Sequence, residues 1–274
     1  MAKSVFNFHS EVLGFHETVH ILFPDPNIYG AWQDGPFDDE MEVLYLLHGL
    51  RGGAHTWTSY TSIERYLYES GRKMIIVMPE MGNDFYTDHK IGWKYFTYVA
   101  EELPRIMETF MRVTPKREKT YVAGLSMGGY GALKTALTFP EKFGFAASFS
   151  GTVDIASSLK ETESLIGKDI PMTRSLRDQL EIYELSKFIF GGPDNIAGTE
   201  NDLYYLLEKT ASSELKPQLY ISCGSGDGLF EANKKFFAQA QEKGYDVRFH
   251  EERNMGHAWS FWDKEIEKLI RTIL

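Results

Sequence analysis

Hydrophobic residues recur along the chain in short runs that end at turn-forming residues. Residues 4–14 and 17–24 alternate as strands do, and they predict two opening strands that can form a hairpin, followed by a loop rich in Gly, Pro and Asp through Asp39. Six later runs are interpreted as further strands, and most of them are almost continuously apolar, which is typical of strands that are buried on both faces. They span residues 42–49, 72–80, 119–126, 143–151, 218–224 and 246–252.

Segments with the periodicity of amphipathic helices lie between most of these strands, at residues 61–70, 95–111, 131–139, 231–244 and 262–274. Strands that alternate with helices predict an α/β fold, a mostly parallel central sheet with helices on both faces. Segment 152–216 is the exception, because it is polar and helical and is too long for a plain connection. We expect a single domain over residues 1–274, with a helical cap insertion at about 152–216.

A glycine-rich turn joins one of these strands to the next helix. Residues 124–128 are Gly-Leu-Ser-Met-Gly, a G-x-S-x-G pattern between a predicted strand and a helix from Ala132 onward. In this setting the pattern is typical of a nucleophile elbow, a sharp turn that holds a serine at the helix N-terminus. A side chain at Gly124 or Gly128 would crowd the neighbouring strand or helix. Ser126 is therefore the candidate nucleophile.

A serine hydroxyl needs a base to accept its proton and a carboxylate to orient that base. Asp227 lies in a glycine-rich turn after one strand, and His257 lies in a loop after the last strand. A lone loop aspartate usually forms a turn and a lone loop histidine is usually solvated. The order Ser126, Asp227, His257 is nevertheless that of α/β-hydrolases, so the three residues together predict a catalytic triad. The competing carboxylates lie at or within the last strand and are Asp246, Glu251 and Glu252.

The tetrahedral intermediate of such a reaction needs two N–H donors. Met127, directly after the serine, provides the first. The second is predicted at the backbone of Leu50, where a buried strand is followed by a glycine-rich loop. His48, just before this loop, is interpreted as a hydrogen-bonded scaffold residue and not as a second base.

Composition narrows the classes of partner and cofactor. The formal net charge of -10 argues against nucleic acid and anionic membranes, which require clustered Lys and Arg. The lone cysteine, Cys223, cannot form an internal disulfide, and the first residues carry neither a secretory signal nor an anchor, so a cytoplasmic protein is expected. Histidines 9, 16 and 20 lie on predicted strands without zinc-type spacing. We expect no metal and no cofactor. Whether the protein forms a homo-oligomer stays open.

Four stretches resemble the esterase D group of α/β-hydrolases, and within it the bacterial tributyrin esterase branch. They are LLHGLRGGAHTW, GLSMGGYGALKTALTFPEKF, GSGDGLFEANKKF and GHAWSFW, and the resemblance extends through nearly the whole chain. It implies an α/β-hydrolase fold with Ser126 as nucleophile, His257 as base, Asp227 as its orienting carboxylate, and the N–H groups of Leu50 and Met127 as the oxyanion hole. The S-formylglutathione hydrolases of this group are expected to carry a cysteine shortly after the oxyanion loop. The region here is RGGAHTW, which argues against a glutathione thioester substrate.

Bulky aromatic residues flank these motifs. Trp57 and Trp259 are predicted to contact the substrate, and together with Trp262 they indicate a short, closed acyl pocket. The predicted function is that of a serine carboxylesterase that hydrolyses small-molecule acetyl to butyryl esters through an acyl-enzyme intermediate. A thioesterase of the S-formylglutathione hydrolase type, an acyltransferase and a catalytically silent binding module stay open as alternatives.

Overall fold

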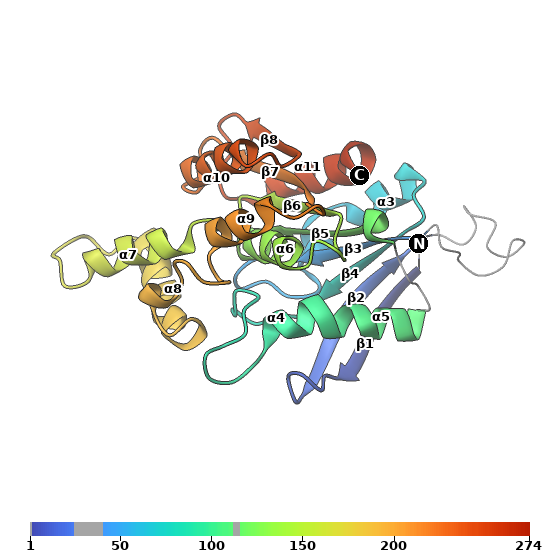
Figure 1. Cartoon of the computed structure of the whole chain (residues 1–274), viewed down its shortest axis with the longest axis horizontal. Helices are drawn as coiled ribbons and strands as arrows, with labels where there is room; N and C mark the ends of the chain where they lie inside the picture. Colours follow the sequence, from blue (N-terminus) through green and yellow to red (C-terminus); the bar gives the residue numbers. More distant parts are fainter. Residues whose placement is uncertain (1, 25–40, 112–115) are drawn as a thin grey trace, which may run out of the picture.

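The structure is a computed structural model that describes residues 2–24, 41–111 and 116–274 (Figure 1). The loop predicted to extend through Asp39 lies mostly outside these residues. An eight-stranded sheet runs through the molecule in the order β1-β2-β4-β3-β5-β6-β7-β8. β1 and β2 form the predicted antiparallel hairpin, β2 also pairs antiparallel with β4, and all other neighbours are parallel.

The described strands are β1 (Ala2–His9), β2 (His16–Phe23), β3 (Glu42–Leu47), β4 (Met74–Pro79), β5 (Thr120–Leu125), β6 (Phe145–Phe149), β7 (Gln218–Gly224) and β8 (Val247–Glu252). β3 shows why the central strands are apolar throughout. Successive side chains of a strand point to opposite faces, and here Val43, Tyr45 and Leu47 join one hydrophobic core while Leu44 and Leu46 join the other. Both faces of the sheet are therefore covered, as the sequence predicted.

The helices are α2 (Thr56–Tyr60), α3 (Ile63–Ser70), α4 (Tyr95–Thr97), η1 (Tyr98–Glu102), α5 (Leu103–Met111), η2 (Arg117–Lys119), α6 (Met127–Thr138), α7 (Ile155–Leu165), α8 (Arg174–Ile189), η3 (Pro193–Asn195), α9 (Leu203–Ala211), α10 (Phe230–Glu242), α11 (Trp259–Lys268) and η4 (Leu269–Ile273). The predicted helix at 95–111 is present as α4, η1 and α5 in succession, with a π-helical turn in its middle. The short helix α2, directly after the glycine-rich loop, was not predicted.

The segment between β6 and β7 consists of α7, α8, η3 and α9, with no strand in it. α7 and α8 extend away from the sheet in Figure 1, whereas α9 lies beside α6. We call α7 and α8 the cap helices, because both contribute residues to a cavity above Ser126. The carboxyl ends of β3, β5, β7 and β8 lead into the loops that carry the predicted site residues.

Candidate active site

The turn between β5 and α6 holds Ser126 in an unusual backbone conformation. Its φ is 54° and its ψ is -117°, and a positive φ is uncommon for a residue with a side chain. The residue two positions later is Gly128 because the backbone of β3 approaches it closely. A Cβ at Gly128 would lie 2.5 Å from the Leu47 carbonyl oxygen and 2.7 Å from that of His48. A Cβ at Gly124 would lie 2.3 Å from the carbonyl oxygen of Gly128. The G-x-S-x-G turn is thus built as the sequence predicted.

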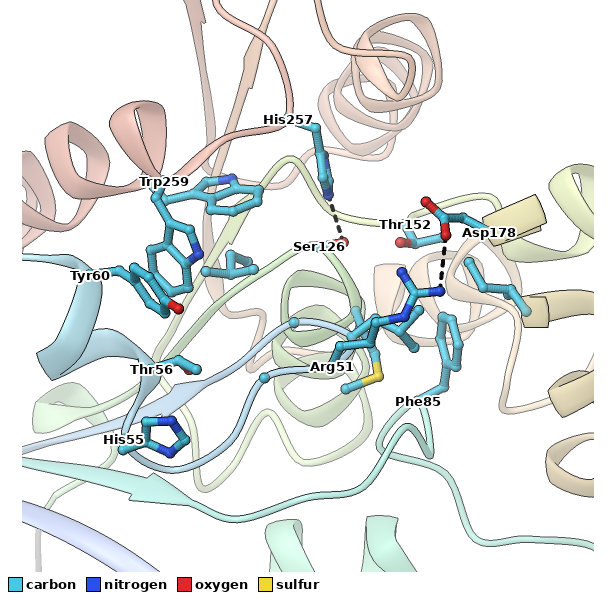
Figure 2. A pocket seen from close by; sticks show the side chains of 17 residues that line it. Arg51, His55, Thr56, Tyr60, Phe85, Ser126, Thr152, Asp178, His257 and Trp259 are labelled. Carbon is cyan, nitrogen blue, oxygen red and sulfur yellow. Dashed lines mark hydrogen bonds and ion pairs between the residues drawn. The ribbon is translucent and has the colours of Figure 1, made fainter. Parts of the chain in front are cut away.

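The structure brings Ser126, His257 and Asp227 together in one hydrogen-bonded chain. His257 Nε2 lies 2.9 Å from Ser126 Oγ (Figure 2). On the other side of the ring, His257 Nδ1 lies 2.8 Å from Asp227 Oδ2. With Nδ1–H donating to the carboxylate, Nε2 is free to accept the serine proton. The arrangement can generate a serine alkoxide equivalent beside a base that is already oriented.

Asp227 is buried, whereas the His257 side chain is 38 % exposed. Burial by itself would raise the pKa of Asp227, but hydrogen bonds and charge attraction from His257, with the Leu229 N–H, hold that pKa below its usual value. The competing carboxylates lie elsewhere. Asp246 accepts a hydrogen bond from the side chain of Gln218, and Glu252 pairs with a lysine of α11.

The two predicted oxyanion donors line the same cavity as Ser126. Met127 is the first residue of α6, so its N–H has no acceptor within the helix. Within the described residues, the N–H of Leu50 has no hydrogen-bond partner either. Two unpaired N–H groups beside a nucleophilic oxygen can stabilise a developing negative charge.

The side chains of His48 and Tyr86 fix the end of β3, from which the Leu50 loop departs. His48 is buried, accepts a hydrogen bond from the Met81 N–H at Nε2 (3.1 Å), and contacts the Gly49 carbonyl through Nδ1 (2.8 Å). Burial lowers the pKa of His48, which favours the neutral ring that these contacts require. The Tyr86 hydroxyl donates to the His48 carbonyl at 2.8 Å. His48 is therefore a scaffold residue, and sequence reasoning missed the part that Tyr86 plays.

The prediction that Trp57 contacts the substrate is wrong. Its side chain is fully buried, its Nε1–H donates to the Leu47 carbonyl at 3.1 Å, and it does not line the cavity. The reason is the short helix α2, which turns Trp57 inward beneath Trp259, with ring centroids 5.5 Å apart. Trp259 does line the cavity, and Tyr60 stacks on it at 4.9 Å.

Two cavities meet at Ser126. We call them the aromatic pocket, with a volume of about 460 Å³, and the cap pocket, with a volume of about 520 Å³. Figure 2 shows the aromatic pocket, with Tyr60 and Trp259 on one side of Ser126 and Arg51, Thr152 and Asp178 on the other. The cap pocket has apolar walls formed by Ile155, Leu159, Leu165, Ile182 and Leu229. The insertion is thus less polar toward the site than its composition indicated.

Residues 11–272 match the model of a family described as "Putative esterase". The chain belongs to this esterase family. It is also similar to an acetyl esterase of Caldicellulosiruptor saccharolyticus, with 28% identity over 97% of this chain and 96% of the relative. The chain is accordingly a carboxylic ester hydrolase, as predicted, and its substrate is a small-molecule ester.

Solved structures of serine hydrolases are similar to this esterase over their whole length. FphF of Staphylococcus aureus, a fluorophosphonate-binding serine hydrolase, aligns with a TM-score of 0.80 and 28% identity, covering 98% of this chain and 96% of that protein. The S-formylglutathione hydrolase FrmB of Staphylococcus aureus aligns with a TM-score of 0.79 and 28% identity, covering 98% and 97%. The fold is the predicted α/β-hydrolase fold, and the similarity supports an esterase D-like group.

Within residues 2–24, 41–111 and 116–274, no helix has the length and apolarity to cross a bilayer. Nor do those residues contain a cluster of three or more His, Cys, Asp or Glu side chains that could hold a metal ion.

Proposed function

We propose that this esterase hydrolyses short-chain acyl esters, from acetyl to butyryl, by an acyl-enzyme mechanism on Ser126. This substrate range fits the tributyrin esterase branch of the esterase D group. The observation that carries the proposal is the continuous hydrogen-bonded chain from Ser126 through His257 to Asp227. The names of an acetyl esterase and a fluorophosphonate-binding hydrolase among its relatives support it.

In the first half of the reaction, Ser126 Oγ attacks the ester carbonyl carbon as His257 Nε2 accepts the hydroxyl proton. The carbonyl oxygen becomes an oxyanion, and the N–H groups of Leu50 and Met127 are assigned to stabilise it. Collapse of this intermediate breaks the bond to the alcohol oxygen, which takes the proton from His257. Water then repeats the sequence on the acyl-serine and releases the acid.

The aromatic pocket is assigned to the acyl group. Tyr60, Trp259 and Trp262 line it with large rings, and Trp262 also packs edge-on against His257 at 4.9 Å. Each methylene that this pocket buries would contribute roughly 0.8 kcal/mol to binding. Once the acyl chain of the substrate reaches the aromatic rings, the steric cost outweighs that gain, so the preferred acyl chain is short.

A series of p-nitrophenyl esters from acetate to octanoate tests the assignment. We expect kcat/KM to be highest between acetate and butyrate and to fall at least tenfold, on the order of 1.4 kcal/mol, by octanoate. Trp259→Ala should move the optimum to a longer chain. Trp93→Ala, at a half-exposed tryptophan outside both pockets, is the matched control and should leave the optimum in place. A wild-type optimum at octanoate would refute the short pocket.

The similarity to an S-formylglutathione hydrolase makes a thioesterase the second candidate. We expect S-formylglutathione not to be preferred over the best oxygen ester, because the loop after Leu50 lacks the cysteine expected for that substrate. A thioester preference of about 100-fold, which corresponds to about 2.7 kcal/mol in transition-state binding, would move the protein to that class. Labelling of Ser126 by a fluorophosphonate probe tests the nucleophile independently of either substrate.

A further inference from the structure

Arg51 directly follows Leu50, the residue whose N–H is assigned to the oxyanion hole. Its φ is 59°, so the loop passes through the left-handed region at a residue with a long side chain. Its N–H donates to the Asn83 side-chain oxygen at 2.7 Å. The backbone at Arg51 is thus held in a conformation that it would not keep without its neighbours.

The Arg51 side chain connects this loop to the cap helix α8. Its Nη2 lies 3.0 Å from Asp178 Oδ1 and also donates to Glu181. Asp178 and Glu181 are three residues apart, so they lie on the same face of the helix. Figure 2 shows the Arg51 guanidinium extending from its loop toward Asp178, on the side of Ser126 away from Trp259.

The same part of α8 forms a wall of the site. Ile182, next to Glu181, lines both the aromatic pocket and the cap pocket, and Gln179, next to Asp178, lines the cap pocket. A change in the position of α8 relative to Arg51 would therefore change the space around the scissile ester and pull on the loop that carries Leu50.

These ion pairs are too exposed to serve mainly for stability. The side chains of Arg51, Asp178 and Glu181 are 45%, 37% and 45% exposed, and pairs at such a surface contribute little to the free energy of unfolding and are weakened by salt. One guanidinium nevertheless engages two carboxylates of one helix beside the nucleophile. Such a contact restricts geometry more than it adds stability.

We propose that Arg51 is a positioning residue that couples the placement of cap helix α8 to the orientation of the Leu50 N–H. When α8 is in contact with Arg51, the N–H is aligned for the oxyanion, and when the contact is broken, the N–H loses that alignment. This inference rests on the proposed function, because it assigns a role to Leu50 during ester hydrolysis.

A mutant cycle at the ion pair tests this coupling. Arg51→Met keeps an unbranched side chain but removes the guanidinium and its charge, and the double variant Asp178→Asn/Glu181→Gln removes the charges of its partners. Each should lower kcat for p-nitrophenyl acetate about tenfold, because the lost interaction acts on the transition state. The combined triple variant should lose no more than either, because the same contact is removed in each case.

Two controls separate positioning from a general structural effect. Glu184→Gln breaks an exposed ion pair with Lys187 on the same helix and should keep kcat within about twofold. The unfolding temperature of every variant should stay close to that of the wild type. In 1 M NaCl, kcat of the wild type should fall toward that of Arg51→Met, whose own kcat should not respond to salt.

Unchanged kcat in Arg51→Met, or losses that add up in the triple variant, would overturn the coupling. Neither result would affect the esterase assignment, because the cycle compares variants that all remain active. A wild-type protein without activity on short-chain esters would contradict the proposed function itself.

Discussion

The strand ends that carry the site and the cap helices that cover it are held in place by different kinds of contact. At the strand ends, backbone segments approach so closely that a Cβ at Gly128 would lie 2.5 Å from the Leu47 carbonyl oxygen, and buried side chains such as Trp57 bond to the same carbonyls. On the cap, exposed ion pairs such as Lys160–Asp194 and Lys187–Glu184 predominate among the charged contacts. We therefore expect the chemistry to depend on a rigid edge, and the cap to vary more readily and alter specificity.

Loss of the buried carboxylate should have the largest effect if this comparison holds. Asp227→Asn should fold normally but lower kcat by about 10³- to 10⁴-fold, because an amide does not fix the His257 tautomer or stabilise its charged form. Steady-state kinetics with p-nitrophenyl acetate measure this. Asp246→Asn, at a carboxylate bonded to the Gln218 side chain, is the control and should keep kcat within about twofold. The reversed outcome, a large loss in Asp246→Asn and none in Asp227→Asn, would show that Asp227 is not the orienting carboxylate.

A glycine-to-alanine substitution at the strand ends and another in the cap sharpen the comparison of these two regions. Gly128→Ala should lower the free energy of unfolding by about 1 to 3 kcal/mol, since the new methyl group overlaps the Leu47 and His48 carbonyls. It should also reduce kcat/KM at least tenfold, as on the order of 1.4 kcal/mol of transition-state stabilisation is lost.

Gly167→Ala, in the turn between the cap helices, is the matched variant. Its φ of 80° makes alanine strained by about 1 kcal/mol, but no atom lies within 4 Å of the new Cβ. Urea unfolding should show this smaller loss, and kcat/KM should be unchanged. Equal losses of activity in the two variants would refute the contrast between edge and cap.

Glu17, on β2, tests how strongly the sheet desolvates a charge. Burial, with the nearby charges of Glu80 and Asp84, raises the pKa of Glu17 from 4.5 to about 7. Between pH 4.5 and about 7, the folded protein therefore keeps a proton on Glu17 that the unfolded chain has released. The contribution of Glu17 to the free energy of unfolding is present at low pH and is lost as pH rises through about 7. Glu17→Gln should match the wild type at pH 5 and exceed its free energy of unfolding by about 1 to 2 kcal/mol at pH 8.

Urea unfolding of the Glu17→Gln variant at the two pH values measures the difference. Glu184→Gln, on the exposed face of α8, is the corresponding cap variant and should change the free energy of unfolding by less than about 0.5 kcal/mol at both. A gain for Glu17→Gln that is equal at pH 5 and pH 8 would show that the substitution acts through packing and not through the charge.

Cys223 should give the smallest effect. It lies at the end of β7, fully buried, and burial together with the charge of Asp227 raises its pKa to about 12. Little thiolate is present at neutral pH, so iodoacetamide should leave esterase activity nearly unchanged. Inactivation that follows the extent of Cys223 labelling would mean that the rigid edge opens to solvent.

The parts of the structure that the sequence predicted are those with a local signature. Continuous apolar runs identify β3 to β7 because a strand buried on both faces needs hydrophobic side chains at every position. The G-x-S-x-G turn identifies Ser126, and the loops that follow β7 and β8 place Asp227 and His257 at the same edge. These features depend on a few consecutive residues.

The parts that were missed depend on contacts between distant residues. Trp57 was misassigned because α2 is only five residues long and has no capping or periodic signal in the sequence. Arg51 and Asp178 are 127 residues apart, and nothing in an exposed arginine or aspartate indicates its partner. The apolar walls of the cap pocket were hidden in the same way, since isolated isoleucines and leucines of a polar segment converge only after folding.

The wide separation of the site residues along the chain also affects when the enzyme becomes active during its synthesis. Ser126 and His257 are 131 residues apart, and His257 is synthesised second. A growing chain that folds from its N-terminus therefore contains the serine, but not its base, until these 131 residues have been added. A chain that terminates before His257 carries the serine turn but no base to activate it, so ester hydrolysis begins only after His257 has been synthesised.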